Sequence, residues 1–207
     1  TNEALGLKLV ASLKQSAGLS GLRAEILKPR LTNFPATVQQ CGDELIATLN
    51  VDASKQKAHL EELTASLKEG DVRRGQAMFN SQKTACSTCH AFGYLGGNVG
   101  PDLTRIGQIR TERDLLEAIV YPSASFVRSY EPVVVVTKSG DDYSGVLRKD
   151  APDEIVLATG PGTEVRLTRK DITEMRAGTV SVMPGGLDEQ LTRQELADLV
   201  AFLKAAK

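Results

Sequence analysis

The chain lacks features on which several large functional classes depend. None of its 207 residues is tryptophan and only 4% are aromatic, so a substrate pocket lined by aromatic rings is not expected. Lys and Arg number 25 and Asp and Glu 26, which leaves no electrostatic reason to expect a nucleic-acid partner. Apolar runs are short, as at Val133–Val136. Because crossing a bilayer takes ~20 apolar residues, we expect no transmembrane segment.

Cysteine and histidine are also scarce, yet most of them stand together. The chain has three cysteines and two histidines, and three of these five residues lie in the pentapeptide from Cys86 to His90, which reads C-x-x-C-H. Two thiols at this spacing can each add to a vinyl group of haem, and the histidine then serves as an axial iron ligand. The motif therefore predicts covalent attachment of one haem c.

Two other uses of a C-x-x-C pair stay open at this point. A structural zinc ion would need a second pair of thiolate or imidazole ligands, and only Cys41 and His59 remain for that task. A thioredoxin-like dithiol would be expected beside a βαβ pattern, whereas the flanks here are rich in glycine. We expect Cys41 to be a buried apolar residue and His59 to lie at the surface.

Residues 1–70 are expected to form a stack of short helices. Apolar residues recur at helical spacing, and Leu5, Leu9 and Leu13 form one such stripe. The segment Pro35–Leu49 resembles one unit of a HEAT-type helical repeat, and we expect it to end at Asn50–Asp52. The first 70 residues are thus expected to be a HEAT-like α-helical segment.

A strand-rich insert is predicted at about 131–170. Four short runs there are β-branched or alternate between apolar and polar residues, and turn residues separate them. The runs are Val133–Thr137, Tyr143–Leu147, Glu154–Leu157 and Glu164–Leu167. We expect a small antiparallel meander that is curled into a partial barrel.

Helices are predicted on both sides of this insert. Asp71 is placed to cap a helix that leads to the Cys86 motif. Thr111 with Asp114, and Thr192 with Glu195, have the spacing of a capping box, in which each side chain accepts a hydrogen bond from the other's backbone. The second box opens the last helix of the chain.

A methionine ahead of that last helix is the best candidate for a second iron ligand. Met183 is followed by Pro184 and two glycines, which favour an irregular loop able to lie across a haem face. A thioether stabilises ferrous iron and suits electron transfer. Met78 is expected to be a core residue of the helix before the motif, and Met175, which follows the strands, stays an alternative.

From Asp71 to Lys207 the chain resembles a class I c-type cytochrome. The likeness rests on ordered motifs: Gly75 and Phe79, the C-x-x-C-H motif, Gly100-Pro101, Met183-Pro184 and Phe202. It implies that the first and last helices of this region cross beside the haem. It also implies that the carbonyl group of Pro101 accepts a hydrogen bond from the His90 ring, which orients the ligand. Residues 71–207 are accordingly expected to be a cytochrome c-like haem domain, and the whole chain to be mainly α.

The spacing of the two ligands departs from a minimal cytochrome. His90 and Met183 lie 93 positions apart, and the strand-rich insert accounts for most of the excess. In this the chain is similar to haem domains that close large bacterial dehydrogenase-like proteins built from a propeller and helical repeats. The segments GPDLT, YPSASF and SVMPGGLDEQLTRQELADLVAFL carry that likeness. It implies a fragment of a larger periplasmic or otherwise extracytoplasmic protein, whose dehydrogenase domain or partner supplies electrons.

The resemblance favours a one-electron carrier with His/Met ligation and no catalysis of its own. The alternatives are a haem enzyme or gas sensor with an open sixth position, and an interaction scaffold with a structural haem. Arg105 is placed to pair with a haem propionate, or else is a solvated loop residue. Four polar residues are expected near the haem without individual roles: Tyr94, Asn98, Tyr121 and Ser123.

Overall fold

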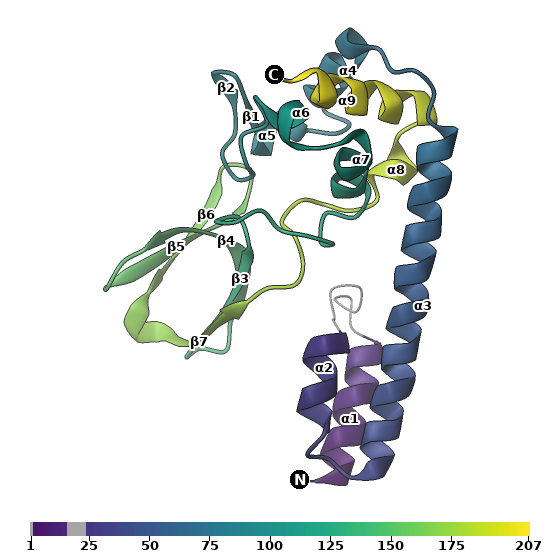
Figure 1. The fold of residues 1–207 in the computed structure, drawn as a ribbon. Helices are drawn as coiled ribbons and strands as arrows, with labels where there is room; N and C mark the ends of the chain where they lie inside the picture. The colour runs from purple at the N-terminus through teal and green to yellow at the C-terminus, as the bar shows by residue number, and fades with distance from the viewer. Residues whose placement is uncertain (1, 16–23) are drawn as a thin grey trace. The chain divides into compact units, whose positions relative to one another are not determined.

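The computed structural model of the chain describes residues 2–15 and 24–207 (Figure 1). The chain divides into two compact units, with bounds Thr1–Glu62 and Leu63–Lys207. The sequence placed a boundary near residue 70, whereas the contacts divide the chain earlier, within a long helix. Each unit has its own hydrophobic core.

In the first unit, the described residues form three helices: α1 (Glu3–Lys14), α2 (Ala24–Leu31) and the N-terminal part of α3 (Ala36–Ser66). Their shared core consists of Val10, Leu27, Leu31, Val38 and Leu45, and Cys41 is half-buried against it. The expected packing stripe of α1 is wrong at Leu5 and Leu9, which are exposed, whereas Leu13 packs against the core. Gly6 and Val10 are the buried residues of this helix. The periodicity missed this face because one of its buried residues, Gly6, has no apolar side chain.

Helix α3 is longer than the sequence indicated. It continues through Asn50–Asp52, where we expected a break, and ends at Ser66. This expectation was wrong because asparagine, valine and aspartate lower helix stability by only a few tenths of a kcal/mol each, about a third or less of the effect of proline. Without glycine or proline the helix has no strong stop signal at this point.

The helices of the second unit are arranged around a crossing of its first and last members. They are α4 (Val72–Phe79), α5 (Cys86–Cys89), α6 (Ile106–Ile109), α7 (Glu112–Val120), α8 (Leu187–Gln190) and α9 (Arg193–Ala205). α4 and α9 cross at Gly75, where a Cβ atom would lie 1.9 Å from the carbonyl oxygen of Asp198. The Phe79 and Phe202 rings pack beside this crossing, with centroids 5.5 Å apart.

An ion pair joins the two crossed helices. Asp198 of α9 is only 3% exposed and accepts hydrogen bonds from Arg74 Nε at 2.6 Å and from the Asp71 backbone N–H at 2.7 Å. Gln194 Nε2 also donates to it, at 2.9 Å. The Arg74 guanidinium, together with these hydrogen bonds, lowers the pKa of Asp198 to about 2.

A five-stranded antiparallel sheet follows α7 in the chain (Figure 1). Its strands are β3 (Pro132–Thr137), β4 (Asp142–Asp150), β5 (Glu154–Gly160), β6 (Thr163–Thr168) and β7 (Ile172–Ala177). The spatial order is β6-β5-β4-β3-β7, so the last strand returns to pair with the first. A short 3₁₀ turn, Arg169–Asp171, precedes β7, and a small hairpin of β1 (Ala91–Phe92) and β2 (Leu95–Gly96) follows α5.

The expectation of a mainly α fold is wrong. The described residues form a five-stranded antiparallel sheet as well as helices, so the fold is mixed α/β. Within this sheet, the strand that the sequence missed is β7, whose residues Ile172–Ala177 are mostly exposed and include Glu174 and Arg176. An edge strand of this kind has only a weak apolar signal.

None of the helices in the described ranges is long and apolar enough to cross a membrane.

Candidate functional site

The C-x-x-C-H motif forms a single helical turn, α5, at the edge of a cavity. Residues three apart on a helix lie on the same face, which places Cys86 and Cys89 side by side. The His90 backbone N–H donates to the carbonyl of Cys86 at 2.9 Å and closes the turn. Both thiols are free, and burial raises the pKa of the Cys86 thiol. The arrangement keeps two thiols and one imidazole within a few residues of one another.

Glycines let the next segment pack directly against the motif. The Gly97 and Gly100 backbone N–H groups donate to the carbonyls of Ser87 and Cys89 at 2.9 and 2.8 Å. A Cβ atom at Gly100 would lie 2.4 Å from Cε1 of His90, which is closer than atoms can approach. The absence of a side chain at residue 100 therefore allows the imidazole ring its present position.

The ring of His90 is fixed by one hydrogen bond. Its Nδ1 lies 2.8 Å from the carbonyl oxygen of Pro101, the contact that the family resemblance implies. A carbonyl oxygen can only accept, so Nδ1 carries the proton and Nε2 keeps a free lone pair. Burial lowers the pKa of His90, which favours the neutral ring that a metal needs.

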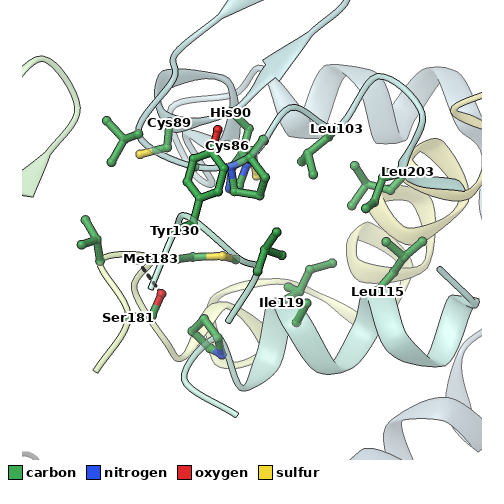
Figure 2. A pocket seen from close by; sticks show the side chains of 18 of the residues that line it. Cys86, Cys89, His90, Leu103, Leu115, Ile119, Tyr130, Ser181, Met183 and Leu203 are labelled. Atoms are coloured by element: carbon green, nitrogen blue, oxygen red, sulfur yellow. Dashed lines mark hydrogen bonds between the residues drawn. The ribbon is translucent and has the colours of Figure 1, made fainter. Parts of the chain in front are cut away.

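The cavity beside the motif encloses about 220 Å³ and lies entirely within the second unit. Cys86, Cys89 and His90 form one wall, and Met183 lies on the opposite side with Ser181 (Figure 2). Most of the remaining lining is apolar: Phe79, Val99, Leu103, Ile106, Leu115, Ile119, Val146, Leu187, Leu199 and Leu203. Two thiols, an imidazole and a thioether in an apolar cavity are a donor set that fits a covalently attached haem.

The three methionines of the chain, all of them among the described residues, differ in their position relative to the cavity. Met183 lines the cavity, in the loop between β7 and α8. Met175 lies on β7 and packs against the core of the sheet, and Met78 lies on α4, where its carbonyl accepts hydrogen bonds from Ser81 and Thr84. Neither of these two residues lines the cavity.

Arg105 is not among the residues that line the cavity. It is exposed and stands at the N-terminal boundary of α6, and the arginine that does line the cavity is Arg110, just after the same helix. The backbone carbonyl of Arg110 accepts a hydrogen bond from Lys204 Nζ at 2.9 Å. One turn of helix separates the two arginines, so sequence position alone could not choose between them.

Two further lining residues were missed by the sequence reasoning. Tyr130 reaches the cavity from the segment between α7 and β3, and its predecessor Ser129 has a φ of 71°, in the left-handed region. Val146 reaches it from β4, and Arg148 of the same strand donates from Nη2 to Asn98 Oδ1 at 2.9 Å. The sequence analysis treated the strands as an insert and did not predict that a residue of β4 would line the cavity.

Clusters of three or more His, Cys, Asp and Glu side chains able to hold a metal ion do not occur among the residues described. No protein-family model matches the chain, and no curated protein matches it significantly.

Proposed function

We propose that this chain attaches one haem c through Cys86 and Cys89 and works as a one-electron carrier, with His90 and Met183 as the residues that would bind the iron. The observation that carries the proposal is the cavity itself, which brings the C-x-x-C-H motif and Met183 to facing walls across 93 residues of sequence. When bound, haem c supplies a reversible one-electron iron couple.

Each residue has a defined task in this proposal. The Cys86 and Cys89 thiols would form the two thioether bonds, and His90 would offer the lone pair of Nε2 while the Pro101 carbonyl holds the ring in orientation. Met183 offers a soft sulfur ligand, which favours the ferrous state and raises the reduction potential. The apolar lining keeps water away from the metal.

We prefer the hypothesis of an electron carrier to that of a haem enzyme or gas sensor because of the position of Met183. An enzyme or sensor of that kind needs an open sixth position, whereas here a thioether lies across the cavity from the imidazole. We also propose that the second unit is related to class I c-type cytochromes. In this chain the sheet lies between the two proposed ligands in the sequence. A periplasmic location and an electron-donating dehydrogenase domain or partner belong to the same proposal.

Attachment is tested by producing the chain with the periplasmic haem-maturation machinery of a bacterial host. The protein should gain the mass of one haem that denaturation does not remove. Cys86→Ser with Cys89→Ser should abolish that gain, whereas Cys41→Ser, at a cysteine of the first unit's core, should not. A protein that matures without covalent haem would refute the proposal.

Ligation is tested with Met183→Leu, which keeps an apolar side chain of similar volume and removes the sulfur. The ferric wild type should show the weak long-wavelength charge-transfer band of methionine–iron ligation, and its ferrous form should not bind CO. Met183→Leu should lose the band, bind CO and have a lower reduction potential, while Met175→Leu should match the wild type. CO binding by the wild type would favour the enzyme or sensor reading.

A further inference from the structure

The loop that carries Met183 has little regular structure of its own. It runs from the end of β7 at Ala177 to the start of α8 at Leu187, and Gly186 at its end has a φ of 78°. A metal ligand on such a loop can move away unless something holds it, because irregular segments are the least stable parts of a fold. The contacts that fix this loop therefore bear on the strength of ligation.

Two hydrogen bonds in series connect Met183 to the segment after α7. The Met183 backbone N–H donates to Ser181 Oγ at 3.1 Å, and the Ser181 backbone N–H donates to Ser123 Oγ at 3.0 Å. All three residues are half-buried. The first of these bonds is drawn in Figure 2, at the side of the cavity where the Met183 sulfur lies.

Ser123 is itself firmly placed. It follows α7 in a turn that is closed by a hydrogen bond from the Ala124 N–H to the Tyr121 carbonyl at 2.9 Å, with Pro122 in the position that a fixed φ favours. α7 is anchored by four buried apolar residues: Leu115, Leu116, Ile119 and Val120. The serine hydroxyl is thus held in a hydrogen-bonded turn that directly follows a buried helix.

We propose that Ser123 is a positioning residue for Met183, acting through Ser181 to hold the thioether at the iron. The inference rests on the proposed His/Met ligation and extends it to two serines that do not touch the metal. A thioether bond to ferric iron is weak, so the loop must be held in place for the sulfur to compete with other ligands.

The test measures how well free imidazole displaces Met183 in the ferric, haem-loaded full chain. Ser123→Ala should bind imidazole about fivefold more tightly than the wild type, the effect expected from losing one neutral hydrogen bond. Ser181→Ala should behave in the same way. The double variant should stay near fivefold, because the bonds act in series, and a value of about 25-fold would overturn that arrangement.

Three controls separate positioning from general damage to the fold. Ser123→Thr keeps a hydroxyl and should restore the wild-type affinity, and Ser144→Ala, at an exposed serine of β4, should leave it unchanged. In a Met183→Leu background, Ser123→Ala should have no effect, because there is no sulfur left to position. An effect that persists in that background would overturn the proposal.

The outcomes also distinguish a failure of the positioning role from a failure of the proposed His/Met ligation on which it rests. If the wild type lacks the methionine–iron band, the proposed ligation fails and the positioning role fails with it. If the wild type has the band but Ser123→Ala and Ser181→Ala leave imidazole affinity unchanged, only the positioning role is refuted. Retained haem content in both variants would show that they fold.

Discussion

At the scale of single residues, the site depends on how closely backbone and imidazole approach each other at Gly100. A methyl group there would lie 2.4 Å from Cε1 and 2.7 Å from Nδ1 of the His90 ring. The ring could not stay where it is, and the hydrogen bond from Nδ1 to the Pro101 carbonyl would be strained or lost. Residue 100 therefore controls the orientation of the proximal ligand without any side-chain chemistry.

Gly100→Ala is accordingly expected to destabilise the protein by about 1–3 kcal/mol, as overpacking does, and to reduce the yield of attached haem. Urea unfolding and the absorbance of attached haem per protein would measure the two effects. Gly160→Ala is a suitable control, since its added Cβ would meet nothing within 4 Å. Equal stability and haem yield in the two variants would show that the contact with His90 is unimportant.

Sequence reasoning identified residues that stand in a recognisable local pattern, as Met183 does beside Pro184, and missed lining residues that stand in none. Cys86, Cys89 and His90 are fixed by their spacing, and Pro101 lies only eleven residues from the ring it contacts. Arg110 and Tyr130 carry no such pattern. They reach the cavity through the path of the chain around α6 and before β3, which no local signal encodes.

At the scale of elements, the residues that cap the N-terminal ends of helices were the most informative part of the sequence. The capping boxes of α7 (Thr111 with Asp114) and α9 (Thr192 with Glu195) are confirmed, because both reciprocal hydrogen bonds form in each. The extension of α3 and the presence of β7 were not foreseen. Helix α3 continues because no glycine or proline stops it at Asn50–Asp52, and β7 forms by pairing with β3 although its own apolar pattern is weak.

The crossing of α4 and α9 should make stability depend on pH through Asp198. Its pKa of about 2 in the folded protein lies below the ordinary aspartate value. A carboxylate with a lowered pKa stabilises the fold above its unfolded pKa of about 4, and that contribution disappears as the pH falls through about 2. The ion pair with Arg74 is partly screened, because the Arg74 side chain is 60% exposed.

Asp198→Asn should therefore lower the free energy of unfolding by about 1–2 kcal/mol at pH 7. The difference from the wild type should shrink as the pH falls from about 4 through about 2, because Asp198 becomes protonated over this range and both side chains are then uncharged. Urea unfolding at a series of pH values measures this, with Asp153→Asn, at an exposed carboxylate, as the control. A difference that is the same at pH 2 and pH 7 would contradict the assignment.

At the scale of the whole molecule, two separate cores imply two separable contributions to stability. The core of the first unit contains Leu45, which is 1% exposed, and none of the residues that line the cavity belongs to this unit. Damage to the first core should thus leave the proposed metal ligation intact.

Leu45→Ala should destabilise the first unit by about 2–5 kcal/mol. Far-ultraviolet circular dichroism should show an earlier loss of helical signal on heating, while the methionine–iron band melts at the wild-type temperature. Leu199→Ala, in the lining of the cavity, is the matched comparison and should shift the melting of the band. A band that melts early in Leu45→Ala would show that the units unfold together.

The sheet has a consequence for the order in which the cavity is completed. The wall with Cys86, Cys89, His90 and Pro101 is built from neighbours in sequence, whereas Met183 arrives only after the five strands from Pro132 to Ala177. Contacts between residues far apart in sequence form slowly during folding, because a large loop must close first. One half of the cavity is therefore local and fast to assemble, and the half that carries the methionine depends on the pairing of β7 with β3.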